Sequence, residues 1–226
     1  NSLELMKSNL GPKHPTTLKS MNNLAMAYNR SGRLADALPL YEQTLEFKKS
    51  KLGPEHPETL QSMNNLGASY WRAKRLDRSI PLFEATLKLR QDKLGFDHPD
   101  TLVTMINLAV NYRDAGRLDE AIPLFEKTLK LLDVKFGQEH AHTIHVKGNL
   151  AQAYLMNEQT DKALPLFDQI IAVDRGRTAP DDPKFAGLLT RLANDLLQHR
   201  QYPAAETYLR ECLAIREKKL PDDWLL

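Results

Sequence analysis

Apolar and small residues recur along the chain at helical spacing. In residues 15–30 they fall at positions i, i+3, i+4 and i+7, which is one face of a helix. A second helical face follows in residues 34–51. The residues on the two faces are Met21, Leu24, Ala25 and Tyr28, then Ala37, Tyr41, Thr44 and Leu45. Pro15 suits the first helical position, and Gly32 and Gly53 supply left-handed stops. The short connection makes this an antiparallel helix pair.

This pair repeats every 42 residues without an insertion. The link 52–60, LGPEHPETL, has close copies at 10–18 and 94–102, a weaker copy at 136–144 and an eroded one at 179–183. The predicted repeats are residues 12–53, 54–95, 96–137, 138–179 and 180–221, in one array that spans 1–226. Residues 1–11 match the end of a preceding repeat. We therefore expect an all-α, right-handed α-solenoid of five helix pairs, each stable only when stacked on its neighbours.

Small and bulky residues alternate on the helix faces that must pack together. Small residues let the partner helix approach, and tyrosines fill the space beside them. The first small set is Ala25, Gly67, Ala109, Ala151 and Ala193, and the second is Ala37, Ser79, Ala121, Ala163 and Ala205. The tyrosines are Tyr28, Tyr70, Tyr112 and Tyr154.

These residues resemble the tetratricopeptide signature, in which a bulky-x-x-Leu-small-x-x-Tyr helix precedes an Ala-x-x-x-Phe helix. Repeat three reads Met105-x-x-Leu108-Ala109-x-x-Tyr112, then Ala121-x-x-x-Phe125. The standard unit has about 34 residues, so about eight more lengthen the second helix and form the link. This long form resembles the kinesin light chain subfamily. Many bacterial proteins also carry this repeat, and a bacterial homologue is one interpretation.

The fifth repeat departs from the others, with Arg191 for Asn, Leu196 for Tyr and Thr207 for Pro. The segment 220–224 resembles the start of another link. Together with residues 1–11, this segment predicts that the sequence is a fragment of a longer protein.

Composition narrows the function without identifying it. Thirty-one basic residues against 29 acidic ones give a net charge of +2, with the two signs interleaved. Nucleic-acid or membrane binding would need clustered basic charge, so neither is expected. Cys212 is the only cysteine, which favours a reducing compartment. No apolar run approaches the ~20 residues of a membrane span, and we predict a cytoplasmic protein.

No pattern in the sequence indicates catalysis or a cofactor. There is no phosphate-binding Gly-rich loop, nucleophile elbow or HExxH helix. Cys212 takes a position held by Thr44, Thr86, Thr128 and Ile170, which predicts a buried, inert thiol. Prolines at positions 39, 81, 123 and 165 should bend the second helices. The chain is therefore predicted not to be an enzyme.

Histidines raise the question of a metal site. His14, His56, His98 and His140 recur with the period, but stacked pairs lie about 10 Å apart, too far to share an ion. Helix capping by the histidine, or by a neighbour such as Asp97, is the favoured interpretation. His142 and His145 could bind a metal only weakly. No metal site is predicted.

Asparagine recurs on the opposite face of the first helix, at Asn23, Asn65, Asn107 and Asn149. The resemblance assigns this face to the inside of a curved groove and this position to peptide contact. One amide per repeat suits the regular N–H and C=O groups of an extended peptide. The asparagines could instead bond neighbouring repeats and set the stacking angle, or persist after recent duplication.

Other groove positions vary and would set specificity. Arginine pairs with carboxylates at two points, and Trp71 offers a large apolar anchor, so a partly acidic peptide is expected. A solvated surface of mixed composition is the alternative. The further groove residues are Lys19, Asn22, Arg30, Asn64, Trp71, Arg72, Arg113, Arg191 and Asn194.

The sequence thus predicts a scaffold that holds an extended, partly acidic peptide of a partner protein. Two alternatives stay open: a regulatory or assembly segment of a larger enzyme, such as a bacterial serine/threonine kinase, and a spacer. Self-association through the ends of the array is also compatible with the sequence.

Overall fold

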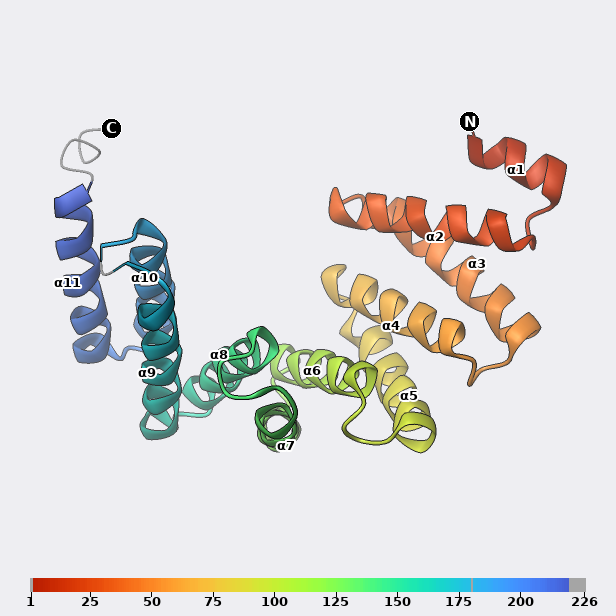
Figure 1. Ribbon diagram of the computed structural model, residues 1–226. Helices are drawn as coiled ribbons and strands as arrows, with labels where there is room; N and C mark the ends of the chain where they lie inside the picture. The colour runs from red at the N-terminus through yellow and green to blue at the C-terminus, as the bar shows by residue number, and fades with distance from the viewer. Residues whose placement is uncertain (1, 180, 220–226) are drawn as a thin grey trace. The chain divides into compact units, whose positions relative to one another are not determined.

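The computed structural model describes residues 2–179 and 181–219, and all regular structure in these ranges is helical (Figure 1). The helices are α1 (Ser2–Leu10), α2 (Pro15–Arg30), α3 (Leu34–Leu52), α4 (Pro57–Arg72), α5 (Leu76–Leu94), α6 (Pro99–Asp114), α7 (Leu118–Phe136), α8 (Ala141–Met156), α9 (Thr160–Arg177), α10 (Pro183–Gln198) and α11 (Tyr202–Lys219). The predicted first helix, 15–30, is confirmed, and the second extends one residue beyond the predicted 51. The chain is therefore built from helix pairs, as its periodicity predicted.

The helices form two compact units, residues 1–117 and 118–226. In the first, α2 to α6 pack in chain order, α1 lies on α2, and α4 also touches α6. In the second, α7 packs on α8, α8 on α9, and α10 on α11. Within each unit the consecutive packing is that of an α-solenoid, whereas the single array over 1–226 stays a prediction.

Histidine caps the first helix in four repeats. Nδ1 of His14, His56, His98 and His140 accepts the backbone N–H of the residue two positions on, at 3.2 Å in each case. Asp182 takes the same role in the fifth repeat, with its Oδ1 2.8 Å from the N–H of Lys184. The cap provides an acceptor for an N–H that the helix leaves unpaired. The capping hypothesis is confirmed, and the capping residue is the histidine itself.

In the first four pairs, the core contains the predicted small residues together with a buried aromatic ring. Ala109 and Ala151 are fully buried, as are the rings of Phe125 and Phe167. Gly67 takes the place of alanine in the second repeat, where a Cβ would lie 3.0 Å from the ring of Phe83. The two helices of this pair therefore approach more closely than an alanine would allow.

The predicted interior position of Cys212 is confirmed, since its side chain is buried and Sγ lies 3.2 Å from Oγ1 of Thr190. The prolines at 39, 81, 123 and 165 lie inside helices that continue through them. Each is the sixth residue of its helix, so it removes a hydrogen bond near the helix start. The link predicted at 220–224 lies outside the described residues.

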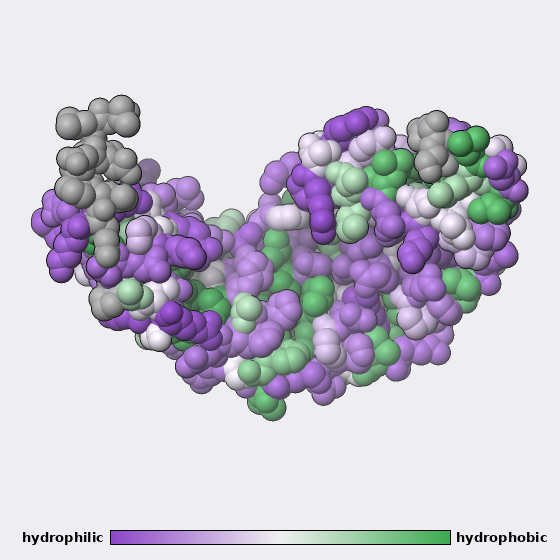
Figure 2. All heavy atoms as spheres, turned by 45° about the horizontal axis from the view of Figure 1, so that its top comes forward, coloured by the Kyte–Doolittle hydropathy of each residue, from purple (hydrophilic) through white to green (hydrophobic). Residues whose placement is uncertain are grey.

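The face shown in Figure 2 is mostly hydrophilic, with apolar side chains scattered among polar ones. None of the described helices is long and apolar enough to cross a bilayer. Among the described residues, no three His, Cys, Asp or Glu side chains are grouped so that they could hold a metal ion.

Candidate functional site

The recurring asparagines occupy the first helices, where they differ in exposure. Asn23 on α2 is exposed, whereas Asn65, Asn107 and Asn149 are half-buried. Oδ1 of Asn65 accepts a hydrogen bond from Nε2 of Gln61 at 2.9 Å, one turn earlier on α4. Nδ2 of Asn149 donates to the carbonyl oxygen one turn earlier on α8, at 2.8 Å. Both of these amides are thus held in place by their own helix.

Asn107 also connects two repeats. Its Nδ2 donates to Oδ1 of Asn64 at 3.3 Å, which links α6 to α4. Asn64 is 8% exposed, so little of its amide reaches the surface. The equivalent of Asn64 one repeat earlier is Asn22, and no donor among the described residues reaches its buried Oδ1. The same pair of positions therefore serves stacking at Asn64 and Asn107, whereas the equivalent Asn22 has a buried acceptor without a donor.

Trp71 and Arg72, predicted for the groove, also take part in the joints between repeats. Nε1 of Trp71 donates to Oδ2 of Asp114 at 2.7 Å, and Nη1 of Arg72 donates to Oδ1 of Asn29 at 2.8 Å. Arg113 forms an ion pair with Asp114 at 2.8 Å, and both side chains are largely buried. Of the two arginines, Arg72 is the exposed one, and its guanidinium is bonded to a neutral amide rather than to a carboxylate.

These bridges share one offset. Asn29–Arg72, Asn64–Asn107 and Trp71–Asp114 each join residues that are 43 positions apart, one more than the period. In the second unit, Nε2 of Gln152 donates to Oδ2 of Asp195 at 3.0 Å, with the same offset. A residue in the first helix of one repeat is thus bonded to the residue that follows its equivalent in the next repeat. We call these bonds the joints between first helices, and several predicted specificity residues lie in them.

In the second unit, two predicted residues meet at one cavity. Asn149 on α8 and Arg191 on α10 line a hollow of about 430 Å³ together with His145, Gln152 and Asp195. Arg191 is exposed, as is Asn194. In the first unit, Lys19 and Arg30 are exposed near the two ends of α2. These four side chains are accessible to a ligand.

Hydrogen bonds between tyrosines and carboxylates were not predicted, although the tyrosines and the glutamates that accept these bonds both recur with the period. Each tyrosine hydroxyl donates to Oε1 of the glutamate that lies 28 residues earlier in the sequence. The pairs are Tyr70–Glu42 at 2.5 Å, Tyr112–Glu84 at 2.7 Å and Tyr154–Glu126 at 2.5 Å. Burial, followed by the bond to Glu42, raises the pKa of Tyr70 to about 12. Buried tyrosine hydroxyls need a partner, so recurring glutamates could have been matched to recurring tyrosines.

The fifth repeat preserves this bond by an exchange of side chains. Leu196 stands where earlier repeats have tyrosine, and Tyr208 stands where they have a leucine such as Leu166. The Tyr208 hydroxyl donates to Oδ1 of Asp168 at 3.0 Å, and Asp168 lies 42 residues after Glu126. Burial first, and then the bond to Asp168, raises the pKa of Tyr208.

A further cavity, of about 500 Å³, lies in the first unit between α2, α3 and the start of α4. Lys19 and Asn22 of the predicted groove line it, together with residues that the sequence did not single out. Its apolar wall and its lysines come from helix ends and from the link, where periodicity alone indicates packing rather than a cavity.

Comparison with known proteins agrees with this architecture. Models of the tetratricopeptide repeat match residues 17–58, 58–133, 100–176 and 141–218, which together cover most of the chain. No curated protein matches the sequence.

Solved structures show the same arrangement. A protein from Podosopora anserina with nearly identical TPR-like repeats, described as a kinesin light chain, has a TM-score of 0.80 at 26% identity over 92% of this chain and 98% of that chain. BtubC (BKLC) from P. vanneervenii has a TM-score of 0.73 at 19% identity, over 96% of this chain and 87% of that one. The apo form of RapI has a TM-score of 0.70 at 17% identity, over 89% and 70%. The resemblance to the kinesin light chain type is confirmed.

Proposed function

Because the chain belongs to the tetratricopeptide repeat family, whose members are generally protein-interaction scaffolds, we propose that it holds an extended, partly acidic peptide of a partner protein. The peptide would lie along the asparagine-bearing faces of the first helices. The observation that carries this proposal is the row of amides on α2 and α4. Oδ1 of Asn22 is a buried acceptor without a donor, and Asn65 uses only its Oδ1 within its own helix.

These amides match what an extended backbone offers. A strand presents alternating N–H and C=O groups, and an asparagine side chain can both donate and accept. Nδ2 of Asn65 would donate to a peptide carbonyl, and Oδ1 of Asn22 would accept a peptide N–H once its amide rotates out of the interior. Pairing an otherwise unsatisfied buried acceptor adds to affinity, since such a group is costly while it has no partner.

Charge supports an acidic ligand on the same helices. Lys19, Arg30 and Arg72 are exposed, and the guanidinium of Arg72 contacts an amide rather than a carboxylate. Arg113 contributes less, because Asp114 already neutralises it. We therefore place the acidic part of the peptide near α2 and α4 rather than α6.

A peptide array tests the proposal. The wild-type chain should bind a subset of extended peptides enriched in Asp and Glu, and Asn65→Ala should weaken that binding about tenfold, or 1.4 kcal/mol. Asn64→Ala is the matched control, because Asn64 is buried and serves the joint with Asn107. Equal binding by wild type and Asn65→Ala would assign the asparagines to stacking. No bound peptide at all would favour a spacer.

A further inference from the structure

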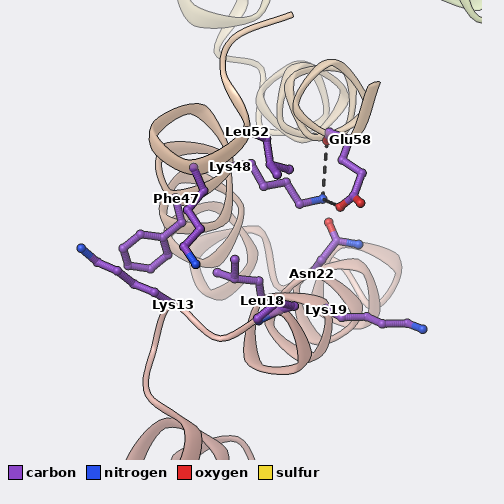
Figure 3. A pocket seen from close by; sticks show the side chains of 10 residues that line it. Lys13, Leu18, Lys19, Asn22, Phe47, Lys48, Leu52 and Glu58 are labelled. Atoms are coloured by element: carbon purple, nitrogen blue, oxygen red, sulfur yellow. Dashed lines mark hydrogen bonds and ion pairs between the residues drawn. The ribbon is translucent and has the colours of Figure 1, made fainter. Parts of the chain in front are cut away.

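The cavity between α2, α3 and α4 combines an apolar wall with several lysines (Figure 3). Leu18, Phe47 and Leu52 form the apolar wall. Figure 3 shows Lys13 lying along the Phe47 ring, and its Nζ is 5.5 Å from the ring centroid. The Lys19 side chain extends away on the other side of the cavity. The cavity mouth is therefore bordered by positive charge on two sides.

The same place exists one repeat later, which gives an internal comparison. A cavity of about 410 Å³ is lined there by Leu60, Leu94 and Lys93, the equivalents of Leu18, Leu52 and Lys51. At that site Nζ of Lys93 pairs with Oε2 of Glu55 at 2.7 Å, and this bond raises the pKa of Lys93. In the second unit, Nη2 of Arg177 lies 3.3 Å from Oε2 of Glu139 at equivalent positions. A cation at this position thus pairs with a carboxylate from the preceding link in both units.

The first repeat breaks the pattern. The residue equivalent to Glu55 and Glu139 is Lys13, so a cation stands where the other repeats have an acid. Lys51 therefore faces a link that carries positive charge instead of negative charge. Among the residues that the structure describes, no carboxylate pairs with Lys13, Lys19 or Lys51.

The acid within the cavity is already engaged. Oε2 of Glu58 pairs with Nζ of Lys48 at 3.2 Å, and the same ammonium group lies 3.5 Å from the Glu58 carbonyl oxygen. Figure 3 shows the Asn22 amide beside this pair, with its oxygen turned toward it. The cavity therefore has an excess of positive charge and one buried acceptor without a donor.

We propose that this cavity anchors the peptide of the proposed function through one carboxylate and one large apolar side chain. The carboxylate takes the position between Lys13 and Lys51 that Glu55 occupies beside Lys93. The apolar side chain packs on Leu18, Phe47 and Leu52. The inference rests on the proposed function, and it specifies where the acidic part of the partner segment binds.

Strand geometry fixes the spacing of the two groups. In an extended peptide, residues i and i+2 point to the same side, whereas i and i+1 point to opposite sides. The anchoring motif is thus Glu or Asp, any residue, then Leu, Ile, Phe or Trp, or the reverse order. Once the Asn22 amide rotates outward, a backbone N–H of the same segment donates to its Oδ1.

Fluorescence anisotropy with a capped, fluorescein-labelled peptide tests the anchor. The probe carries two Glu-Ser-Leu units between Gly-Ser flanks, and its matched forms replace Glu with Gln or Leu with Ser. Each replacement should weaken binding to the wild-type chain at least about fivefold. The loss caused by Gln should shrink in 0.5 M NaCl, because salt screens exposed charges. A wild-type chain that does not bind the probe, or that binds all three forms equally, overturns the anchor.

Lys13→Glu rebuilds the pair seen at Glu55 and Lys93, and it should weaken binding of the acidic probe at least about tenfold. Lys88→Glu, on the exposed side of α5, has the same effect on net charge and should change affinity less than twofold. Lys13 is exposed and lies outside any helix, so neither folding nor circular dichroism should change. Equal losses from both variants would mean that net charge, not the cavity, attracts the probe.

The experiments distinguish failure of the cavity anchor from failure of the proposed peptide-binding function. If the peptide array detects binding that depends on Asn65 but Lys13→Glu leaves the affinity for those peptides unchanged, the anchor is wrong and the peptide-binding function stands. If the array detects no peptide with wild type, the function itself is wrong.

Discussion

Replacing Gly67 with alanine should destabilise the first unit by about 1 kcal/mol, although alanine is the better helix former. Alanine in a helix interior gains about 0.8–1 kcal/mol over glycine. Against this, the new Cβ would lie 3.0 Å from two ring atoms of Phe83 and 3.1 Å from a third. The ring must retreat by about 0.4 Å, and it is fully buried, so overpacking of about 1–3 kcal/mol applies. The steric cost therefore exceeds the gain.

A bond across the same contact adds to this cost. Oγ of Ser79, one turn before Phe83 on α5, donates to the carbonyl oxygen of Gly67 at 2.9 Å. Moving α5 away from α4 to admit a methyl group stretches this hydrogen bond. In the other repeats, alanine stands at both equivalent positions, so no such bond resists a wider spacing.

Urea unfolding followed by circular dichroism measures the change, with hydrogen exchange of α4 and α5 to locate it, because repeat arrays can unfold in parts. Gly187→Ala is the control, since a Cβ there meets no atom within 4 Å. That variant should be about 0.5–1 kcal/mol more stable. Adding Phe83→Leu to Gly67→Ala should restore part of the loss, as Leu209 stands opposite Ala193 in the fifth repeat. A stability gain from Gly67→Ala alone would refute the reasoning.

Three further changes test other contacts. His98→Ala should lower the free energy of unfolding by about 1 kcal/mol through loss of the cap, and His98→Asp should retain it; urea midpoints compare them. The raised pKa of Tyr70 favours its neutral form in the folded chain. Its contribution to stability is therefore complete below pH 10 and is lost as the pH rises toward 12, so unfolding midpoints should fall less steeply there in Tyr70→Phe. Arg90 is 2% exposed with an unbonded Nε, and burial lowers its pKa. Arg90→Met should raise stability by about 1 kcal/mol in a thermal melt, because Leu132 fills the equivalent position and a buried charge is removed; a drop would show that its bonds outweigh its desolvation.

Helix positions were predictable because local chemistry determines them. Proline at the first position, glycine in the left-handed conformation after Tyr28 and apolar residues at helical spacing all act within a few residues. The glycine φ values confirm the stops, at +78° for Gly32 and +89° for Gly53. Periodicity then transfers each assignment to the next repeat.

The polar contacts were less predictable, because they depend on how one repeat lies against the next. Asparagine at position 107 could be assigned to a face, but its bond to Asn64 requires the stacking offset. Tyr208 shows the same limit, since it replaces a leucine in the repeat and still reaches Asp168. At Lys13, by contrast, the charge reversal is visible in the aligned repeats, and only the cavity beside it had to come from the structure.

The joints between first helices also bear on how such an array can be rearranged. At equivalent positions, one joint of the first unit pairs Asn29 with Arg72, and the next pairs Trp71 with Asp114. Exchanging the second and third repeats would bring Asn29 opposite the carboxylate of Asp114, an amide facing an acid instead of a guanidinium. Trp71 would lose its acceptor. The side chains at each joint therefore match one particular neighbouring repeat and specify the order of the repeats. A consensus sequence, with the same residues in every repeat, would remove this specification.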